Sequence, residues 1–426
     1  MTAFPTSPEF QSNWKPRFFT IWSGQALSLV GSALVQFALV WWLTIKTGSA
    51  TTLATASLAA LLPQIVLGPF VGALVDRWNR RIIMIVADSS IAVATALLMV
   101  LFAMDRVAVW HIYLLMFVRS LGGAFHFPAM AASTSLMVPG QHLARVAGMN
   151  QTLQGTVNIF APPLGALLLE LMPTQNVLAI DIGTALAAVL PLLFIAIPQP
   201  VRRTEGAGKK PSYWQDLREG FRYVVRWPGL LGIILLAMML NFLLSPVSAL
   251  TPLVVTDVFH KGAAELGWLR AVFGAGTIIA GVILSAWGGF RRRIVTSLGG
   301  VIGVGLGVVL FGLAPADRFF LLLIASFLQG SAVVFANGPL QAIFQSSIAP
   351  DVQGRVFSLI GAGAAAMMPL SLLIAGPVAD WLGVRFWYTL GGAICILVTV
   401  AASFVPAIMN IEQNQVSAQS ALAPDG

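Results

Sequence analysis

The chain has 426 residues, of which 58% are hydrophobic and 9% are charged. Soluble domains carry about 25% charged residues, so the composition excludes an ordinary soluble globule as well as a disordered chain. One cysteine and four histidines exclude a disulfide framework, and we expect neither a metal centre nor a cofactor. In a chain this apolar, the formal net charge of +8 indicates membrane topology and anionic lipid head groups, not nucleic acid.

Apolar stretches recur along the chain, and each is near the roughly 20 residues that cross a bilayer as a helix. No apolar segment of a cleavable signal precedes Trp14, so we expect the first span to be retained. The sequence predicts an all-α membrane protein with about twelve transmembrane helices, over residues 18–44, 53–75, 82–104, 110–132, 146–169, 177–197, 230–255, 266–287, 294–313, 319–341, 356–376 and 386–406.

Lysine and arginine are distributed unequally between alternate loops. With the N-terminus inside, seventeen of the 24 lie on the cytoplasmic side and six lie outside, while Arg119 lies within a span. Cytoplasmic loops carry the excess of positive charge in membrane proteins. The sequence therefore predicts a multi-pass protein with both termini in the cytoplasm.

Residues 198–228 form the one long polar interval between the predicted spans. The first part is basic and typical of a flexible linker, and the part from Trp214 onward predicts an amphipathic helix lying along the lipid head groups. The interval separates an N-terminal six-helix half, residues 1–197, from a C-terminal six-helix half with a short tail, residues 229–426.

The two halves echo one another at a nearly constant offset. Residues 46–50 correspond to 260–264, residues 80–83 to 292–295, and residues 139–146 to 350–356. Three matches in the same order predict a duplicated six-span unit, a plan in which the binding site lies between the repeats at mid-membrane.

The loop between the second and third spans carries the most specific motif. Residues 72–81 read GALVDRWNRR, which resembles the signature loop of the major facilitator superfamily: Gly, three residues, Asp-Arg, then a basic pair. The resemblance implies that the acid sits at the positive N-terminus of span eleven. The alternative is a basic loop that only sets topology. We expect the gating residues to be Gly72, Asp76, Arg77, Arg80, Arg81 and Arg355.

Further segments look like the macrolide-efflux branch of the drug:proton antiporters, namely residues 21–26, 41–50, 119–129 and 354–359. The resemblance implies a monomeric, proton-coupled secondary transporter of the bacterial cell (inner) membrane that exports amphipathic or macrolide-like compounds. Residues 161–165, APPLG, depart from the Gly-Pro and Gly-Gly pattern of these antiporters. Export of a metabolite or siderophore, or uptake of a solute, therefore stays open.

Functions other than transport have less support. A membrane enzyme needs a clustered nucleophile or metal constellation, whereas the acids and histidines here are dispersed. Polar stripes on several spans argue against a non-transporting receptor. The chain has no Gly-x4-Gly-Lys loop, so we do not expect ATP-driven transport. The expected partners are a small amphipathic molecule, protons and membrane lipid, without nucleic acid.

Three charged residues are predicted to lie inside the bilayer, where each costs several kcal/mol unless it is paired or hydrated. Arg119 lies in span four and matches the arginine that drug:proton antiporters carry there, which implies a role in proton coupling. Asp88 in span three is the leading candidate for its carboxylate partner, and Asp181 in span six is the alternative. A static buried pair is the competing interpretation.

Polar side chains also recur at helical spacing on spans one, four, five, seven and ten. The resemblance implies that spans one, four, seven and ten line the transport cavity, whereas the simpler interpretation is hydrogen bonding between helices. The candidate cavity residues are Gln25, Gln36, His126, Asn150, Gln154, Asn158, Asn241 and Asn337.

Overall fold

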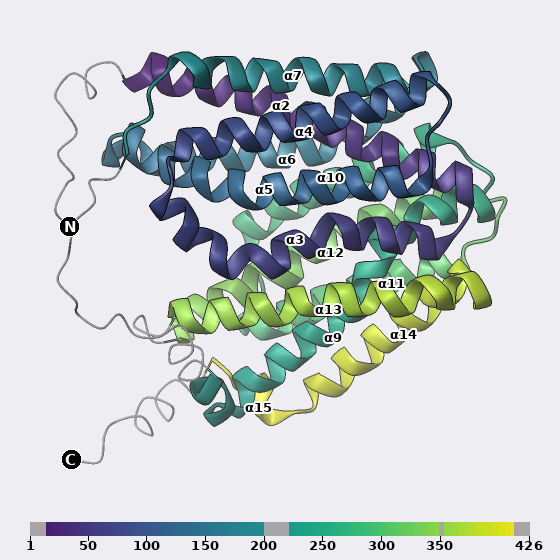
Figure 1. Ribbon diagram of the computed structural model, residues 1–426. Coiled ribbons are helices and arrows are strands. Elements are labelled where there is room, and N and C mark those ends of the chain that lie inside the picture. Colours follow the sequence, from purple (N-terminus) through teal and green to yellow (C-terminus); the bar gives the residue numbers. More distant parts are fainter. Residues whose placement is uncertain (1–13, 200–220, 349–352, 413–426) are drawn as a thin grey trace, which may run out of the picture. The chain divides into compact units, whose positions relative to one another are not determined.

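The computed structural model describes residues 14–199, 221–348 and 353–412 (Figure 1). Within these ranges, twelve helices are long and apolar enough to cross a membrane. They are α2 (Trp14–Thr47), α3 (Ala50–Arg77), α4 (Arg80–Ala103), α5 (Val109–Met137), α6 (Gly140–Leu171), α7 (Thr174–Phe194), α9 (Pro228–Leu253) with its π-helical end η1 (Val254–Val258), α10 (Ala263–Trp287), α11 (Arg293–Leu313), α12 (Phe320–Ser347), α13 (Gln353–Leu382) and α14 (Val384–Ser403).

The observed helix ends differ from the predicted ones by a few residues. The first helix begins at Trp14, whose side chain is buried against Phe18, and not at Phe18 itself. The last span ends at Ser403, because Pro406 opens a separate short helix, α15 (Pro406–Met409). Proline suits the first turn of a helix and not its interior. Of the predicted linker helix, residues 221–226 are helical, and the part before them lies outside the described residues.

The described residues form two compact units. The first contains residues 14–48, 55–199 and 262–267, and the second contains residues 49–54, 221–261, 268–348 and 353–412. The first turn of α3 therefore belongs to the second unit, and the first residues of α10 belong to the first unit.

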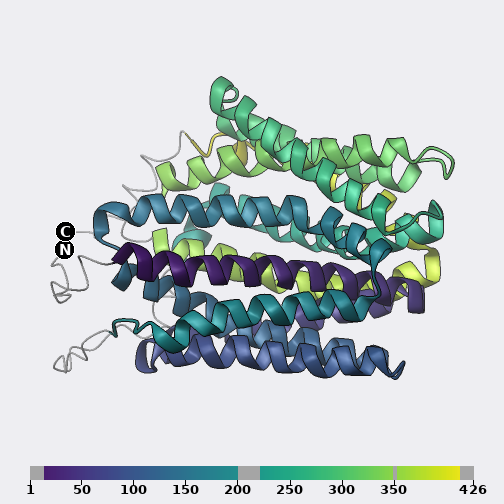
Figure 2. The same ribbon diagram turned by 90° about the horizontal axis from the view of Figure 1, so that it is seen from above.

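In the first unit, α2 packs closely on α7, and α4 packs on both α5 and α7 (Figures 1 and 2). Two glycines seven residues apart explain how close α2 comes. A Cβ added at Gly24 would lie 2.4 Å from the Ala187 carbonyl oxygen, and one added at Gly31 would lie 2.1 Å from Thr184 Oγ1. Small residues let transmembrane helices approach backbone to backbone.

In the second unit, α11 lies between α12 and α14, and glycines again allow the helices to pack closely. A Cβ added at Gly300 would lie 2.3 Å from the Ala336 backbone nitrogen of α12, and one added at Gly312 would lie 2.3 Å from Thr389 Oγ1 of α14. In its most apolar stretch, 61% of the residues of α11 are buried. This helix is therefore surrounded mainly by protein.

Short connections fix the ends of several helices. Gly48 has a φ of +56°, a left-handed conformation that suits glycine, and only Gly48 and Ser49 separate α2 from α3. Asn79 caps α4, because its side chain accepts hydrogen bonds from the backbone N–H groups of Arg81 and Ile82 at 3.0 and 3.4 Å.

Candidate functional site

A buried ion pair lies inside the first unit. Arg119 Nη1 on α5 is 2.6 Å from Asp181 Oδ2 on α7, and the two side chains are only 11% and 2% exposed. The guanidinium also donates to Thr95 Oγ1 on α4 at 3.3 Å and to the Ser32 carbonyl oxygen on α2 at 3.2 Å. Four helices therefore meet at one arginine.

The Asp181 carboxylate is bound on several sides. Besides Arg119, it accepts hydrogen bonds from the hydroxyls of Ser32 at 3.3 Å and Thr95 at 3.4 Å. The absence of a side chain at Gly31 leaves room for the Asp181 carboxylate beside α2, because a Cβ at that position would lie 3.1 Å from Asp181 Oδ1. An arginine keeps its charge at any physiological pH, so the countercharge of Asp181 is permanent.

A second carboxylate lies nearer to the start of α4 and has a different neighbour. Asp88 Oδ2 accepts a hydrogen bond from Gln25 Nε2 on α2 at 3.0 Å. Asp88 Oδ1 is 3.4 Å from His126 Nε2 on α5, and the side chains of the aspartate and the histidine are 8% and 19% exposed. His126 Nε2 is buried and has no hydrogen-bond partner among the described residues. An imidazole can gain or lose a proton and a guanidinium does not, so the two carboxylates face groups of different chemistry.

The two sites repeat along the same three helices. Gln25 and Ser32 on α2, Asp88 and Thr95 on α4, and Arg119 and His126 on α5 are each seven residues apart. Seven residues are two helical turns, or ~10.5 Å. We call Gln25, Asp88 and His126 the titrating layer, and Ser32, Thr95, Arg119 and Asp181 the fixed layer.

The structure therefore pairs Arg119 with Asp181, the alternative partner, and not with Asp88. Counted from the predicted span ends, Asp88 and Arg119 lie within about one helical turn of each other in depth. In the structure Thr95 is level with Arg119, and Asp88 lies two turns away along the same helix. Depth counted from uncertain span ends has too little precision to identify a partner.

The remaining candidate cavity residues are spread over both units. Asn150 on α6 accepts a hydrogen bond from the Trp22 indole N–H at 2.7 Å, and Gln154 donates to Asn158 on the same helix at 3.1 Å. In the second unit, Asn241 and Asn337 donate to carbonyl oxygens of their own helices, α9 and α12. Gln36 on α2 is half-buried.

Two of the candidate gating residues are bound inside the first unit. Arg80 is buried, and its Nη1 donates to the Ala132 carbonyl oxygen at 3.0 Å. The Arg81 guanidinium donates to the carbonyl oxygens of Leu192 and Leu193 near the end of α7. These contacts join the start of α4 to α5 and α7.

The other candidate gating residues give less information. Gly72 and Arg77 are exposed, and no described heavy atom lies within 4 Å of a Cβ added at Gly72. The side chains of Asp76 and Arg355 lie outside the described residues.

Two members of this region are not among the residues that the sequence predicts. Thr95 follows Asp88 by seven residues on the same helical face, and this spacing is the signal that points to it. Gly31 has no comparable signal. In the second unit, the topology count places Arg270 among the six external residues, whereas it lies inside α10 and its guanidinium donates to Ser248 Oγ and the Ser248 carbonyl oxygen on α9.

In the described part of the chain, twelve apolar helices with charged residues buried among them define a multi-pass membrane protein. The sequence model of the Major Facilitator Superfamily matches residues 21–361 and 245–421. The chain belongs to this superfamily, and it is a transporter and not an enzyme.

Relatives with assigned names agree with the predicted branch. The chain is 34% identical to "Macrolide efflux protein A" of Streptococcus pyogenes over 404 residues, which cover 95% of this chain and 99% of the relative. It is 34% identical to the protein of the same name from Enterococcus faecalis over 76% of this chain and 100% of that protein. The "Multidrug efflux pump Tap" of Mycolicibacterium fortuitum is 25% identical over 90% of this chain and 94% of the pump. The resemblance to the macrolide-efflux type is confirmed.

Solved structures show the same fold. The nucleoside transporter NupG has a TM-score of 0.64 at 13% identity and covers 89% of this chain and 97% of its own. The D-xylose-proton symporter also has a TM-score of 0.64 at 13% identity and covers 92% of this chain and 98% of its own. The predicted all-α fold with about twelve transmembrane helices is thereby confirmed.

Proposed function

We propose that the protein exports amphipathic, macrolide-like compounds from the cytoplasm and is driven by protons moving inward. The near-full-length similarity to proteins named for macrolide efflux supports the direction and the substrate class. The observation that supports proton coupling is the pair of polar layers in the first unit, because their two carboxylates have countercharges of different kinds.

The coupling proton binds in the titrating layer. When His126 is protonated, the charges of Asp88 and His126 cancel. When it is neutral, the layer carries a buried negative charge that accepts a hydrogen bond from Gln25. An uncompensated charge inside a membrane protein is costly. Proton loss therefore changes the stability of the conformation that buries this layer, which is the requirement for coupling.

The fixed layer holds the helices that carry the titrating layer. Arg119 bridges α2, α4 and α7 from α5, so these helices keep one register while the proton binds and leaves. Its own charge is permanent, so it positions the proton site and does not itself exchange a proton.

The inner loop motif supplies the gate in this proposal. The resemblance of residues 72–81 to the signature loop supports this role for Asp76. Asp76→Asn should slow transport while leaving erythromycin affinity largely intact, because the residue belongs to the inner loop and not to the candidate cavity residues. Lost affinity with an unchanged conformational equilibrium would contradict the gating role.

Transport in vesicles tests the function directly. Inside-out proteoliposomes with an acidic interior should accumulate labelled erythromycin, and an ionophore that collapses the pH gradient should abolish the accumulation. Accumulation that is the same with and without the pH gradient would exclude proton coupling. Accumulation only in right-side-out proteoliposomes would indicate uptake. If erythromycin never moves while a metabolite or siderophore does, the substrate class is wrong.

We propose a location in the bacterial cell membrane with both termini cytoplasmic, on the evidence of the lysine and arginine distribution. A reporter fused after Ala207 should be cytoplasmic and one inserted after Ala263 should be external. Finding both reporters on the same side would exclude the proposed topology.

A further inference from the structure

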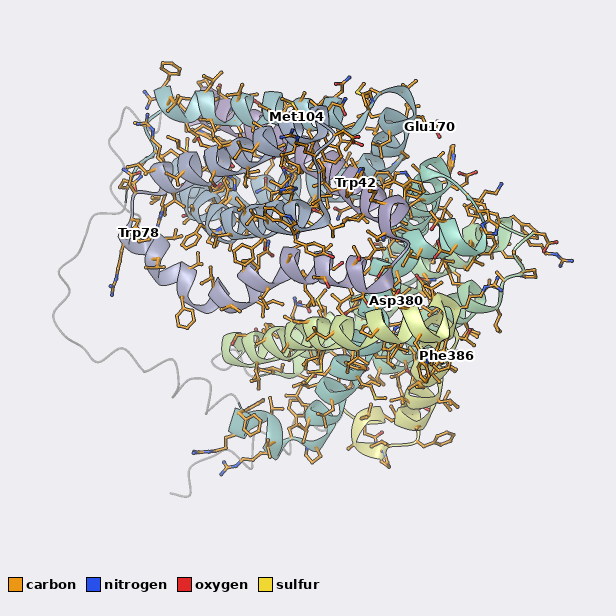
Figure 3. All side chains as sticks on the ribbon, turned by 45° about the vertical axis from the view of Figure 1, so that its right-hand side comes forward. Trp42, Trp78, Met104, Glu170, Asp380 and Phe386 are labelled. Carbon is orange, nitrogen blue, oxygen red and sulfur yellow. The ribbon has the colours of Figure 1, made fainter. Side chains whose placement is uncertain are left out.

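Asp380, near the end of α13, is bound to the start of α3, a helix more than 300 residues earlier in the chain (Figure 3). Asp380 Oδ1 accepts the Ala50 backbone N–H at 2.6 Å, and Oδ2 accepts the Thr51 backbone N–H and the Ser49 hydroxyl, both at 3.0 Å. The first N–H groups of a helix have no partner within the helix and attract negative charge. All these residues belong to the second unit.

Gly376, one turn before Asp380, brings the two helices together. A Cβ added at Gly376 would lie 3.0 Å from Ala54 Cβ and 3.0 Å from Thr51 Cα. The Gly-x3-Asp spacing is the same as that of Gly72 and Asp76 at the end of α3. On α13 the glycine permits the close approach and the aspartate follows one turn later, whereas no described atom lies within 4 Å of a Cβ at Gly72.

We propose that Gly376 and Asp380 form a latch that holds the first turn of α3 and releases it during each transport cycle. The helix does not need Asp380 in order to begin. Ser49 already caps it from within, because its Oγ accepts the Thr52 backbone N–H at 3.2 Å. The contact with Asp380 can therefore break while α3 stays helical, as a switch requires.

The first turn of α3, which the latch holds, is connected covalently to the helix that carries part of both polar layers. Only Gly48 and Ser49 join the first turn of α3 to α2. The same α2 helix carries Gln25, bonded to Asp88, and Ser32, bonded to Asp181. The inference rests on the chain being a transporter but not on its substrate or its coupling ion.

A reversible crosslink tests whether the latch must open. A Cβ built at Gly376 lies 3.0 Å from Ala54 Cβ, and a disulfide needs about 3.5–4.5 Å, so Ala54→Cys with Gly376→Cys closes a disulfide once the two helices separate by several tenths of an ångström. Cys395, the one native cysteine, is replaced by serine in the same protein. Oxidation should close the disulfide and stop erythromycin accumulation in proteoliposomes, and a reductant should restore it. Each single cysteine variant should transport at the same rate with the oxidant as with the reductant, whatever its rate relative to the wild type. Wild-type transport by the crosslinked protein would overturn the latch.

A second measurement needs no substrate. Ala54 is 3% exposed, so the thiol of Ala54→Cys should react slowly with a maleimide in detergent. Adding Asp380→Asn should speed labelling about fivefold, as loss of a helix cap predicts. Gly376→Ala should act in the same direction. Gly361→Ala on α13 and Asp317→Asn on an exposed surface should not, because no described atom lies within 4 Å of a Cβ at Gly361 and the Asp317 side chain is 79% exposed.

The two measurements separate this inference from the proposed function. If the uncrosslinked protein moves no erythromycin, the proposed substrate fails, while the labelling rates still decide whether Asp380 holds the first turn of α3. If Asp380→Asn lowers the melting temperature but leaves labelling unchanged, Asp380 is a static cap and the latch is wrong.

Discussion

Asp88 and His126 face each other across α4 and α5 with Oδ1 and Nε2 3.4 Å apart, although a guanidinium lies only two helical turns away along α5. That guanidinium, of Arg119, is fully engaged with Asp181, Thr95 and Ser32. The charged groups on the helices around the titrating layer are thus this permanent pair on one side and, eight and seven residues before Asp88 on α4, Arg80 and Arg81 on the other. The α2 and α3 helices contribute the neutral amides of Gln25 and Gln64 to this region.

Removing either member of the Arg119–Asp181 pair should shift the pH profile of erythromycin exchange, and the two removals should shift it in opposite directions. Two unit charges ~10 Å apart interact by about 1.7 kcal/mol at an effective dielectric constant of ~20. Arg119→Ala uncovers a negative charge that favours the protonated titrating layer, so its profile should move up by as much as about one pH unit. Asp181→Asn leaves a positive charge and should move the profile down.

The double variant Arg119→Ala/Asp181→Asn is the control for these shifts, because it restores a neutral fixed layer. Its exchange profile should lie near that of the wild type, and its melting temperature should exceed that of Arg119→Ala, since an unpaired buried charge costs about 3–5 kcal/mol. Shifts of the same sign in both single variants would show that packing, and not charge, is responsible.

Replacing His126 should remove the dependence of erythromycin binding on pH. His126→Gln keeps a hydrogen-bonding side chain beside Asp88 but cannot change charge, so binding measured in detergent between about pH 5 and pH 8 should become flat. His142→Gln is the matched control, because His142 stacks on Trp14 at the start of α2 and is distant from both layers. If folded His126→Gln binds erythromycin with the pH dependence of the wild type, the coupling proton binds at another site.

The approach of α2 to α7 should depend on the absence of a side chain at Gly31. Gly31→Ala places its Cβ 2.1 Å from Thr184 Oγ1, so we expect a destabilisation of about 1–3 kcal/mol, read as a lower melting temperature in detergent. Adding Thr184→Ala removes the hydroxyl and should recover part of the loss. Gly183→Ala, which has no described atom within 4 Å of its Cβ, should leave the melting temperature nearly unchanged.

Two adjacent glycines of α11 should respond very differently to alanine. Gly300→Ala places its Cβ 2.3 Å from the Ala336 backbone nitrogen, and a backbone atom cannot move aside without shifting α12. Gly299→Ala meets no described atom within 4 Å and also raises helix propensity. We expect Gly300→Ala to melt well below the wild type and Gly299→Ala at or above it. Equal melting temperatures would contradict the packing of α11 on α12.

The sequence predicted the number, type and approximate ends of the helices, because twelve apolar stretches of membrane-spanning length leave few alternatives. It also identified Arg119, Asp88 and Asp181 as buried charges. It could not assign the partner of Arg119, since that depends on how α4, α5 and α7 are rotated and shifted against one another. The contact of Asp380 with Ala50 and Thr51 could not be predicted from the sequence either, because no local pattern links residues so far apart.

The shared seven-residue spacing on α2, α4 and α5 has a mechanical consequence. A helix that tilts or slides in the first unit takes both of its polar residues with it, so the bonds of Gln25 and of Ser32 break together or not at all. Small independent movements of one helix are therefore penalised twice, once at each end of a ~10.5 Å span. The four helices that the two layers join, α2, α4, α5 and α7, should consequently rotate as one rigid body, and the flexible joints of the cycle must lie outside these layers.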